Sequence, residues 1–240
     1  MRAIICGANG AMGKLICERL GSEVAGRVSI DGENGVPRTF AALGTVGADM
    51  LIDFSHHTAV SDVLAYAKEH GLPTVIGTTG HTAGEKQLIF DAAKELPIFF
   101  SGNMSLGIAV LCRLAKQAAA CFPDADIEIV EAHHNRKADA PSGTALLLAD
   151  AVKAKRPDAE YVFGRSGQHK RQPNVIGIHA LRMGNVVGEH EVIFATDNQT
   201  ITLKHQAHDR ALFAEGALAA AHFVVGQPAG LYHMDHLLGL

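Results

Sequence analysis

Residues 7–13 read Gly7-Ala-Asn-Gly10-Ala-Met-Gly13, and this glycine-rich stretch is the strongest indication of the architecture. It directly follows Arg2–Cys6, an apolar run that predicts a strand, and it opens a segment whose apolar residues recur at helical spacing up to Leu20. Glycines between a strand and a helix let the chain turn sharply and let a pyrophosphate approach the free N–H groups of the helix start. The spacing G-x-x-G-x-x-G is a variant of the usual G-x-G-x-x-G, and here it favours a dinucleotide site over an ordinary turn.

Short β-branched runs alternate with helical periodicity from Arg2 to about Phe100, which is typical of βαβ units and a parallel sheet. We expect strands at Arg2–Cys6, Glu23–Val28, Met50–Phe54, Thr74–Ile76 and Ile98–Phe100. The apolar stripes of the intervening helices lie within Met12–Leu20, Val60–Ala67 and Leu88–Ala93. The pattern predicts an α/β protein whose N-terminal part is a Rossmann-type doubly wound parallel sheet.

A second, smaller α+β domain is expected to begin near Asn103. A helical segment at 106–120 comes first, and the residue pattern changes after it. The strands of this domain alternate apolar and polar residues with little helix between them, which favours a mixed or antiparallel sheet. These strands are Asp126–Glu131, Val186–Phe194 and Thr200–His205. The last helical stretch, Asp209–Val225, is apolar enough to pack back onto the first domain.

The composition excludes several classes of protein. The chain has 240 residues, of which 48% are hydrophobic, so it has ample material for a core. A net charge of −4 does not provide the basic face that a nucleic-acid binder needs. The N-terminal apolar run is too short for a signal peptide, and no stretch reaches the roughly 18 apolar residues of a membrane span, so a cytoplasmic protein without a membrane partner is expected. The four cysteines show no C-x-x-C pairing and are expected to be reduced.

Cofactor preference depends on the residues that follow the second strand. An acidic residue about 20 residues after the glycines would bind the adenosine ribose, and Asp31 is the candidate. If the strand ends at Val28, however, Arg27 and Ser29 lie near the ribose and would tolerate a 2′-phosphate. The sequence therefore leaves NADH and NADPH as alternatives.

Three more loops follow predicted strands: Asp53-Phe-Ser-His56, Gly77-Thr-Thr-Gly80 and Ser101-Gly-Asn-Met104. Ligands of doubly wound sheets bind at the carboxyl ends of the strands, so the second and third loops are expected to line the nicotinamide side. Ordinary βα turns are the alternative for all three loops.

The stretch Glu131-Ala-His133-His134-Asn-Arg-Lys137-Ala-Asp139-Ala-Pro-Ser142-Gly143-Thr144 carries the densest group of titratable side chains. Ser142 is expected to cap the apolar helix that follows, so that the N–H groups of Gly143 and Thr144 form an anion site. Lys137 adds a cation, and the two histidines can supply or accept a proton. The cluster predicts a pocket for a small acidic substrate that needs protonating; a solvated loop with a normal cap is the alternative.

Two further arginines and the histidines complete the candidates. Arg182, in a predicted turn between strands, and Arg210, before the last helix, could reach a substrate or a neighbouring subunit; an interface or surface ion pair is the alternative for both. The 14 histidines show no H-E-x-x-H or comparable spacing, and adjacent His133 and His134 point to opposite faces if their strand continues. No metal site is expected.

These stretches resemble the dihydrodipicolinate reductase family. The resemblance covers essentially the whole chain and is carried by Gly7–Gly13, Gly77–Gly80, Glu131–Thr144 and Gly188-Glu-His190, of which Glu131–Thr144 is the specific part. It implies NAD(P)H-dependent reduction of a cyclic dicarboxylate, 4-hydroxy-tetrahydrodipicolinate, in lysine and diaminopimelate biosynthesis by a cytoplasmic homotetramer. It also implies that residues 1–103, completed by 212–240, bind the dinucleotide and that 104–211 bind substrate and assemble the oligomer.

The resemblance further implies roles for single residues. His133 and Lys137 match the positions that exchange the proton, without assigning the donor between them. The expected substrate-binding residues are His134, Ser142, Gly143 and Thr144. The expected cofactor contacts are Gly7, Ala8, Asn9, Gly10, Ala11, Met12, Asp31, Gly77, Thr78, Thr79, Ser101, Gly102, Asn103 and Met104. Met104 departs from the family pattern, because members often carry an aromatic residue there.

Two other functions are consistent with the residues alone. The same fold could oxidise or reduce another small acid, which the substrate that consumes reduced cofactor would reveal. A non-catalytic dinucleotide sensor would bind the cofactor but tolerate Lys137→Ala and His133→Ala.

Overall fold

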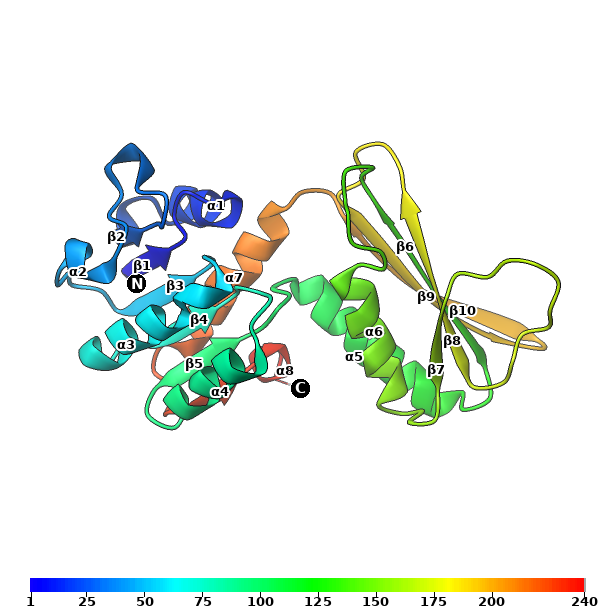
Figure 1. Cartoon of the computed structure of the whole chain (residues 1–240). Coiled ribbons are helices and arrows are strands. Elements are labelled where there is room, and N and C mark those ends of the chain that lie inside the picture. The colour runs from blue at the N-terminus through cyan, green and yellow to red at the C-terminus, as the bar shows by residue number, and fades with distance from the viewer. Residues whose placement is uncertain (240) are drawn as a thin grey trace. The chain divides into compact units, whose positions relative to one another are not determined.

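The computed structural model describes residues 1–239, which form two compact units (Figure 1). The first unit contains Met1–Ser105 and the segment from Ala211 onward, and the second contains Leu106–Arg210. The chain therefore passes twice between the units, and its C-terminal segment belongs to the N-terminal one. No helix among residues 1–239 is long and apolar enough to cross a membrane.

The first unit is built on a six-stranded sheet in which all neighbouring strands are parallel. Its strands are β1 (Ala3–Cys6), β2 (Val24–Val28), β3 (Met50–Asp53), β4 (Thr74–Ile76), β5 (Pro97–Phe100) and β11 (Gly230–Tyr232). The spatial order is β11-β5-β4-β3-β1-β2, so the winding direction reverses between β1 and β3. Ligands of such sheets bind at the carboxyl ends of the strands beside this switch point.

Helices cover both faces of this sheet. They are α1 (Ala11–Leu20), α2 (Phe40–Leu43), α3 (Val60–His70), α4 (Ala83–Ala92), α7 (Ala211–Val224) and α8 (Met234–Leu237). α3 and α4 pack together on one face, and α1 and α7 pack together on the other. α3 is followed by Gly71, which caps it in the left-handed conformation (φ 63°), and α4 begins with a capping box between Thr82 and Glu85. α7 approaches the loop after β5 so closely that a Cβ on Gly216 would lie 1.6 Å from the carbonyl oxygen of Met104.

The second unit is a five-stranded mixed sheet with two helices on one face. Its elements are α5 (Leu106–Cys121), β6 (Asp126–His133), α6 (Gly143–Lys153), β7 (Glu160–Phe163), β8 (Val175–Arg182), β9 (Gly188–Thr196) and β10 (Gln199–Ala207). The order is β10-β9-β6-β8-β7, with antiparallel pairs on the β10 side of β6 and parallel pairs on the β7 side. Alternate strand residues such as Ile127, Ile178 and Phe194 form its core with α5 and α6.

The α/β class, the parallel sheet and the mixed sheet agree with the sequence pattern, but several elements do not follow from it. β7, β8, β11, α2 and α8 are additional, and β6 continues two residues past the predicted end at Glu131. β11 has three residues and β7 has four, both at sheet edges, so their pairing with β5 and β8 is what makes them strands. Sequence periodicity contains little information on such short elements.

Candidate active site

The glycine-rich turn joins β1 to α1 and leaves no room for a side chain at its first and last glycines. Gly7 has a φ of 80°, and a Cβ on it would lie 2.3 Å from the carbonyl oxygen of Phe54. A Cβ on Gly13 would lie 2.1 Å from the carbonyl oxygen of Gly7. Among the residues that the structure describes, no side chain caps α1 at Gly10, so the first N–H groups of the helix remain for an anion. This cradle fits a dinucleotide pyrophosphate.

Asp31 lies beside this turn although it is not part of β2, which ends at Val28. Asn9 of the turn donates from Nδ2 to Oδ1 of Asp31 (2.5 Å), and the backbone N–H of Glu33 donates to the same oxygen (3.0 Å). These hydrogen bonds, that of Asn9 first, lower the pKa of Asp31. Arg38 donates to the carbonyl oxygen of Asp31 (3.0 Å), so a carboxylate and a guanidinium both stand near the glycine turn. Ser29, directly after the strand, is buried.

Asp53, at the end of β3, holds the next loop in place. Its carboxylate is 1% exposed and accepts from the hydroxyls of Ser55 (2.5 Å) and Thr78 (2.7 Å). Burial raises the pKa of Asp53. The ring of Phe54 occupies the space of a side chain at Gly77, where a Cβ would lie 2.3 Å from Cζ. The loop Gly77–Gly80 is therefore fixed against the loop that follows β3, and this second loop in turn borders the glycine turn at Gly7.

The loop after β5 is also ordered by its own side chains. The hydroxyl of Ser101 donates to the carbonyl oxygen of Asn103 (2.7 Å), and Oδ1 of Asn103 accepts from the N–H of Ser105 (2.9 Å). Met104 is buried. Since β4 and β5 are parallel neighbours, this loop lies at the carboxyl ends of the strands, as Gly77–Gly80 does.

In the second unit, Glu131 is the centre of a buried polar cluster. Its side chain is 0% exposed and pairs with both terminal nitrogens of Arg182 (2.7 and 2.8 Å). It also contacts Nδ1 of His133 (2.6 Å) and accepts from the N–H of Ser142 (3.0 Å). Burial acts to raise the pKa of Glu131, but the hydrogen bonds from these three residues, that of Arg182 foremost, outweigh burial and lower it. Glu131 is therefore a buried carboxylate with a full set of partners.

Ser142 connects this cluster to α6. Its hydroxyl accepts from the N–H of Ala145 (3.2 Å), which caps the helix, and it lies 3.1 Å from Nε2 of His190. The rings of His190 and His133 meet edge to face, with centroids 5.1 Å apart. Burial, followed by the neighbouring His133, lowers the pKa of His190 to about 4, so this histidine is neutral at neutral pH.

Lys137 lies in the loop between β6 and α6. Its Nζ is 2.8 Å from Oδ1 of Asp139, and this hydrogen bond is the main reason that the pKa of Asp139 is lowered. Arg182 donates to the carbonyl oxygen of Asp139 (2.6 Å), which ties the same loop to β8. The loop between β6 and α6 therefore carries the ammonium group of Lys137 and is joined to the Glu131 cluster through Arg182.

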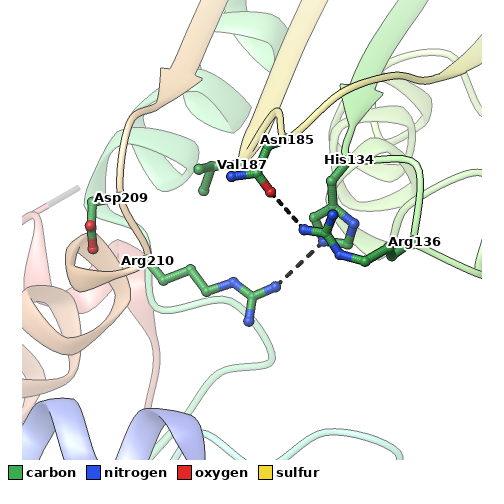
Figure 2. Close-up of a pocket in the computed structure, with 6 residues that line it drawn as sticks. All are labelled: His134, Arg136, Asn185, Val187, Asp209 and Arg210. Atoms are coloured by element: carbon green, nitrogen blue, oxygen red, sulfur yellow. Dashed lines mark hydrogen bonds between the residues drawn. The ribbon is translucent and has the colours of Figure 1, made fainter.

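An open hollow of about 440 Å³ lies beside this loop, wholly within the second unit (Figure 2). It is lined by His134, Arg136, Asn185, Val187, Asp209 and Arg210. Nη2 of Arg210 is 3.5 Å from Nε2 of His134, and Arg136 donates to Oδ1 of Asn185 (2.6 Å). Burial and the cations Arg136 and Arg210 lower the pKa of His134. With two guanidinium groups against one carboxylate, the hollow suits an anionic ligand.

Family models match almost the whole chain. The model described as "Dihydrodipicolinate reductase, N-terminus" matches residues 1–104, and that described as "Dihydrodipicolinate reductase, C-terminus" matches residues 107–238. This chain belongs to the dihydrodipicolinate reductase family. A relative named 4-hydroxy-tetrahydrodipicolinate reductase from Caldanaerobacter subterraneus subsp. tengcongensis is 46% identical over 99% of this chain and 98% of its own length. A relative of the same name from Clostridium tetani is 42% identical over 99% and 97%.

Solved structures share the fold of this dihydrodipicolinate reductase family member. A dipicolinate-bound dihydrodipicolinate reductase from Paenisporosarcina sp. TG-14 superposes with a TM-score of 0.80 at 23% identity, and the match covers 97% of each chain. An amine dehydrogenase from Mycobacterium smegmatis superposes with a TM-score of 0.61 at 12% identity over 98% and 95% of the two chains. The fold of this chain is therefore also found in a structure whose sequence is only 12% identical to it.

In this member of the dihydrodipicolinate reductase family, the candidate residues fall into groups. The structure brings the glycine turn, Asp31 and the Gly77–Gly80 loop to the carboxyl ends of the strands in the first sheet. In the second unit, it places His133 and Ser142 around Glu131. His134 instead leaves the strand, which ends at His133, and lines the hollow with Arg210. Gly143 and Thr144 begin α6 as expected.

Some site residues do not follow from sequence reasoning. Arg136, Asn185 and Val187 line the hollow, although the sequence suggested no role for any of them; Arg136 lies within the stretch Glu131–Thr144. Arg182 forms a buried pair with Glu131, whereas a surface ion pair or a substrate contact was expected. The Glu131–Arg182 pairing has no local signal, because the two residues lie on different strands, β6 and β8. Within residues 1–239, no group of three or more His, Cys, Asp or Glu side chains is arranged to hold a metal ion.

Proposed function

We propose that this chain reduces 4-hydroxy-tetrahydrodipicolinate to tetrahydrodipicolinate with NADH or NADPH, in lysine and diaminopimelate biosynthesis. The observation that carries this proposal is the 46% identity, over essentially the full length, to a relative that bears the reductase name. The net reaction consumes a hydride and a proton and releases water. The chain must therefore hold a dinucleotide, bind a dicarboxylate and provide a proton.

The first unit would hold the cofactor. When bound, NADH or NADPH supplies the hydride. The first turn of α1 offers N–H groups and the helix dipole to the pyrophosphate, because no side chain caps the helix at Gly10. Thr78, with Gly77 and Thr79, and the loop Ser101–Met104 are the expected neighbours of the nicotinamide, and Asp31 is the expected neighbour of the ribose. The hydrogen bond from Asn9 to Asp31 supports this placement.

The second unit would bind the substrate and provide the proton. His134, Arg136 and Arg210 offer donors to a carboxylate in the hollow, and Gly143 and Thr144 offer the start of α6. Hydride addition to an unsaturated ring makes it more basic, so a proton donor must stand near it. His133, oriented by Glu131, and Lys137, held by Asp139, are the two residues proposed for this step. Ser142 serves by capping α6.

We infer a cytoplasmic homotetramer in which residues 104–211 assemble the oligomer. The β9–β10 part of the second sheet supports this inference, because its face opposite α5 and α6 carries a cluster of charged side chains. In this cluster, Nζ of Lys204 lies 2.8 Å from the carboxylate of Glu191 and 3.3 Å from that of Glu189. Light scattering of the purified chain is expected to give four times the monomer mass, and a monomer at micromolar concentration would contradict the inference.

The proposed reaction is tested by cofactor oxidation. A dihydrodipicolinate synthase would generate the substrate in place from pyruvate and aspartate semialdehyde, and NADH and NADPH would be supplied separately. We expect loss of nicotinamide absorbance that depends on the synthase, on both of its substrates and on this chain. Dinucleotide binding without oxidation of either cofactor would favour a sensor, and oxidation with only another small acid would favour a different dehydrogenase.

A further inference from the structure

The carboxylate of Glu131 uses all of its acceptor positions. Oε1 accepts from the N–H of Ser142 (3.0 Å) and from Nη2 of Arg182 (2.7 Å). Oε2 accepts from Nη1 of Arg182 (2.8 Å) and lies 2.6 Å from Nδ1 of His133. Each oxygen thus has two partners, and they come from three separate segments of the chain. A buried carboxylate is tolerated only with such compensation, so the arrangement constrains all three segments at once.

The charge of this carboxylate fixes the tautomer of His133. An ionised carboxylate has no proton to donate, so the short contact to Nδ1 requires the imidazole to carry its proton on Nδ1 when it is neutral. Arg182 stabilises the ionised form of Glu131, and its own pKa is raised by this hydrogen bond. Nε2 of His133 is consequently the nitrogen that can take up and release a proton.

His133 is buried, and the residues around its Nε2 keep bulky side chains away from this nitrogen. Gly188 lies next to the imidazole of His133. A Cβ on Gly188 would lie 3.2 Å from Nε2 of His133, so a larger side chain would cover this nitrogen. The ring of His190 meets His133 edge to face, and its low pKa of about 4 keeps it uncharged. His190 therefore packs against His133 without adding a second positive charge.

We propose that Glu131 is a positioning residue, which fixes the tautomer and orientation of His133 and, through Ser142, aligns the start of α6 with it. This inference rests on the proposed function, in which His133 exchanges the proton and α6 helps to bind the substrate. Glu131 itself is fully buried, and its acceptor positions are already used by His133, Ser142 and Arg182. It sets the separation between the proton-exchanging nitrogen and the anion-binding end of the helix, which a reductase of a small dicarboxylate must hold constant.

The chain offers a matched control on the same strand. Glu128 also accepts from a histidine, Nε2 of His179 (2.8 Å), and from an arginine, Nε of Arg171 (3.2 Å), but it lies on the opposite face of β6. Glu128→Gln therefore removes the same kinds of contact as Glu131→Gln, away from His133 and α6.

The test combines kinetics with the tautomeric state of His133. We expect Glu131→Gln to lower kcat roughly 100-fold, the scale of general acid–base catalysis, with the Kd for NADH unchanged, while Glu128→Gln retains wild-type kcat. We expect nitrogen NMR of the wild-type imidazole to show a proton on Nδ1, and this preference to weaken in Glu131→Gln. A folded Glu131→Gln variant with wild-type kcat, or equal losses in both variants, would overturn the proposal.

The spectroscopic measurement also covers the case in which Glu131→Gln does not fold. A wild-type His133 protonated on Nε2 would overturn the proposal without any variant. If the wild type oxidises neither cofactor with substrate, the proposed function fails, whereas an active wild type with an Nε2-protonated His133 refutes only the role of Glu131.

Discussion

Acidification is expected to destabilise this protein through His190, whose side chain is buried between Ser142 and His133. Burial, with the neighbouring His133 as a secondary cause, lowers its pKa from 6.5 to about 4. Below about pH 6.5 the unfolded chain takes up a proton at this position while the folded chain does not. The stabilisation is therefore fully present above pH 6.5 and is lost as the pH falls towards 4.

The size of this effect follows from the difference between the two pKa values. It corresponds to roughly 3 kcal/mol of the free energy of unfolding. This is on the order of a quarter to a half of the total free energy of unfolding of a typical domain. Because only 4% of His190 is exposed, solvent screening does not reduce the effect much. Carboxylates with lowered pKa values, such as Glu85 at about 2, act in the same direction, so a comparison with a variant is needed to isolate His190.

The comparison uses His190→Gln, which keeps a polar group near Ser142 but does not titrate. Urea unfolding at about pH 7 and about pH 4 would give the free energy of unfolding of both proteins. We expect the wild type to lose roughly 3 kcal/mol more than the variant between these two values. Equal losses in the two proteins would show that His190 is not the buried neutral group described above.

Three further predictions concern the site. Lys137→Ala is expected to lower kcat at least about 100-fold in the coupled assay while the Kd for NADH stays the same; equal loss of both would contradict a role for Lys137 in proton transfer. Arg210→Ala is expected to raise the KM for the substrate roughly tenfold by removing a charged donor from the hollow, and an unchanged KM would place the carboxylate elsewhere. Gly7→Ala is expected to weaken NADH binding and to cost about 1–3 kcal/mol of stability in urea unfolding, because of its φ of 80° and the 2.3 Å approach to Phe54; wild-type binding would mean that the turn does not hold the pyrophosphate.

Local patterns were sufficient to predict the elements that surround the dinucleotide site. β1, the glycine turn and α1 follow one another within the first 20 residues, and each carries its own signal in the sequence. The end of β2 at Val28 was one of the two alternatives that the sequence allowed. The hydrogen bond that brings Asp31 back to Asn9 depends on the course of the loop between them, which no periodicity describes.

The polar contacts of the second unit show why the cluster around Glu131 was not predictable from the sequence. Glu131 and Arg182 are 51 positions apart, and Ser142 and His190 are 48 apart, so their contacts exist only because β6 lies between β8 and β9. A charged residue in a strand is ordinarily interpreted as solvent-facing. Knowledge of the strand order is therefore necessary before Glu131 can be recognised as a buried group that organises the site.

Hydride delivery to the substrate is tested most directly with cofactor that carries deuterium at the transferable position of the nicotinamide. The product of the coupled reaction would be analysed by mass spectrometry, with unlabelled cofactor and with Lys137→Ala as controls. We expect the wild-type product to be heavier by a single deuterium and the variant to form almost none. A product without deuterium, formed at the wild-type rate, would contradict the assignment of this chain as the reductase.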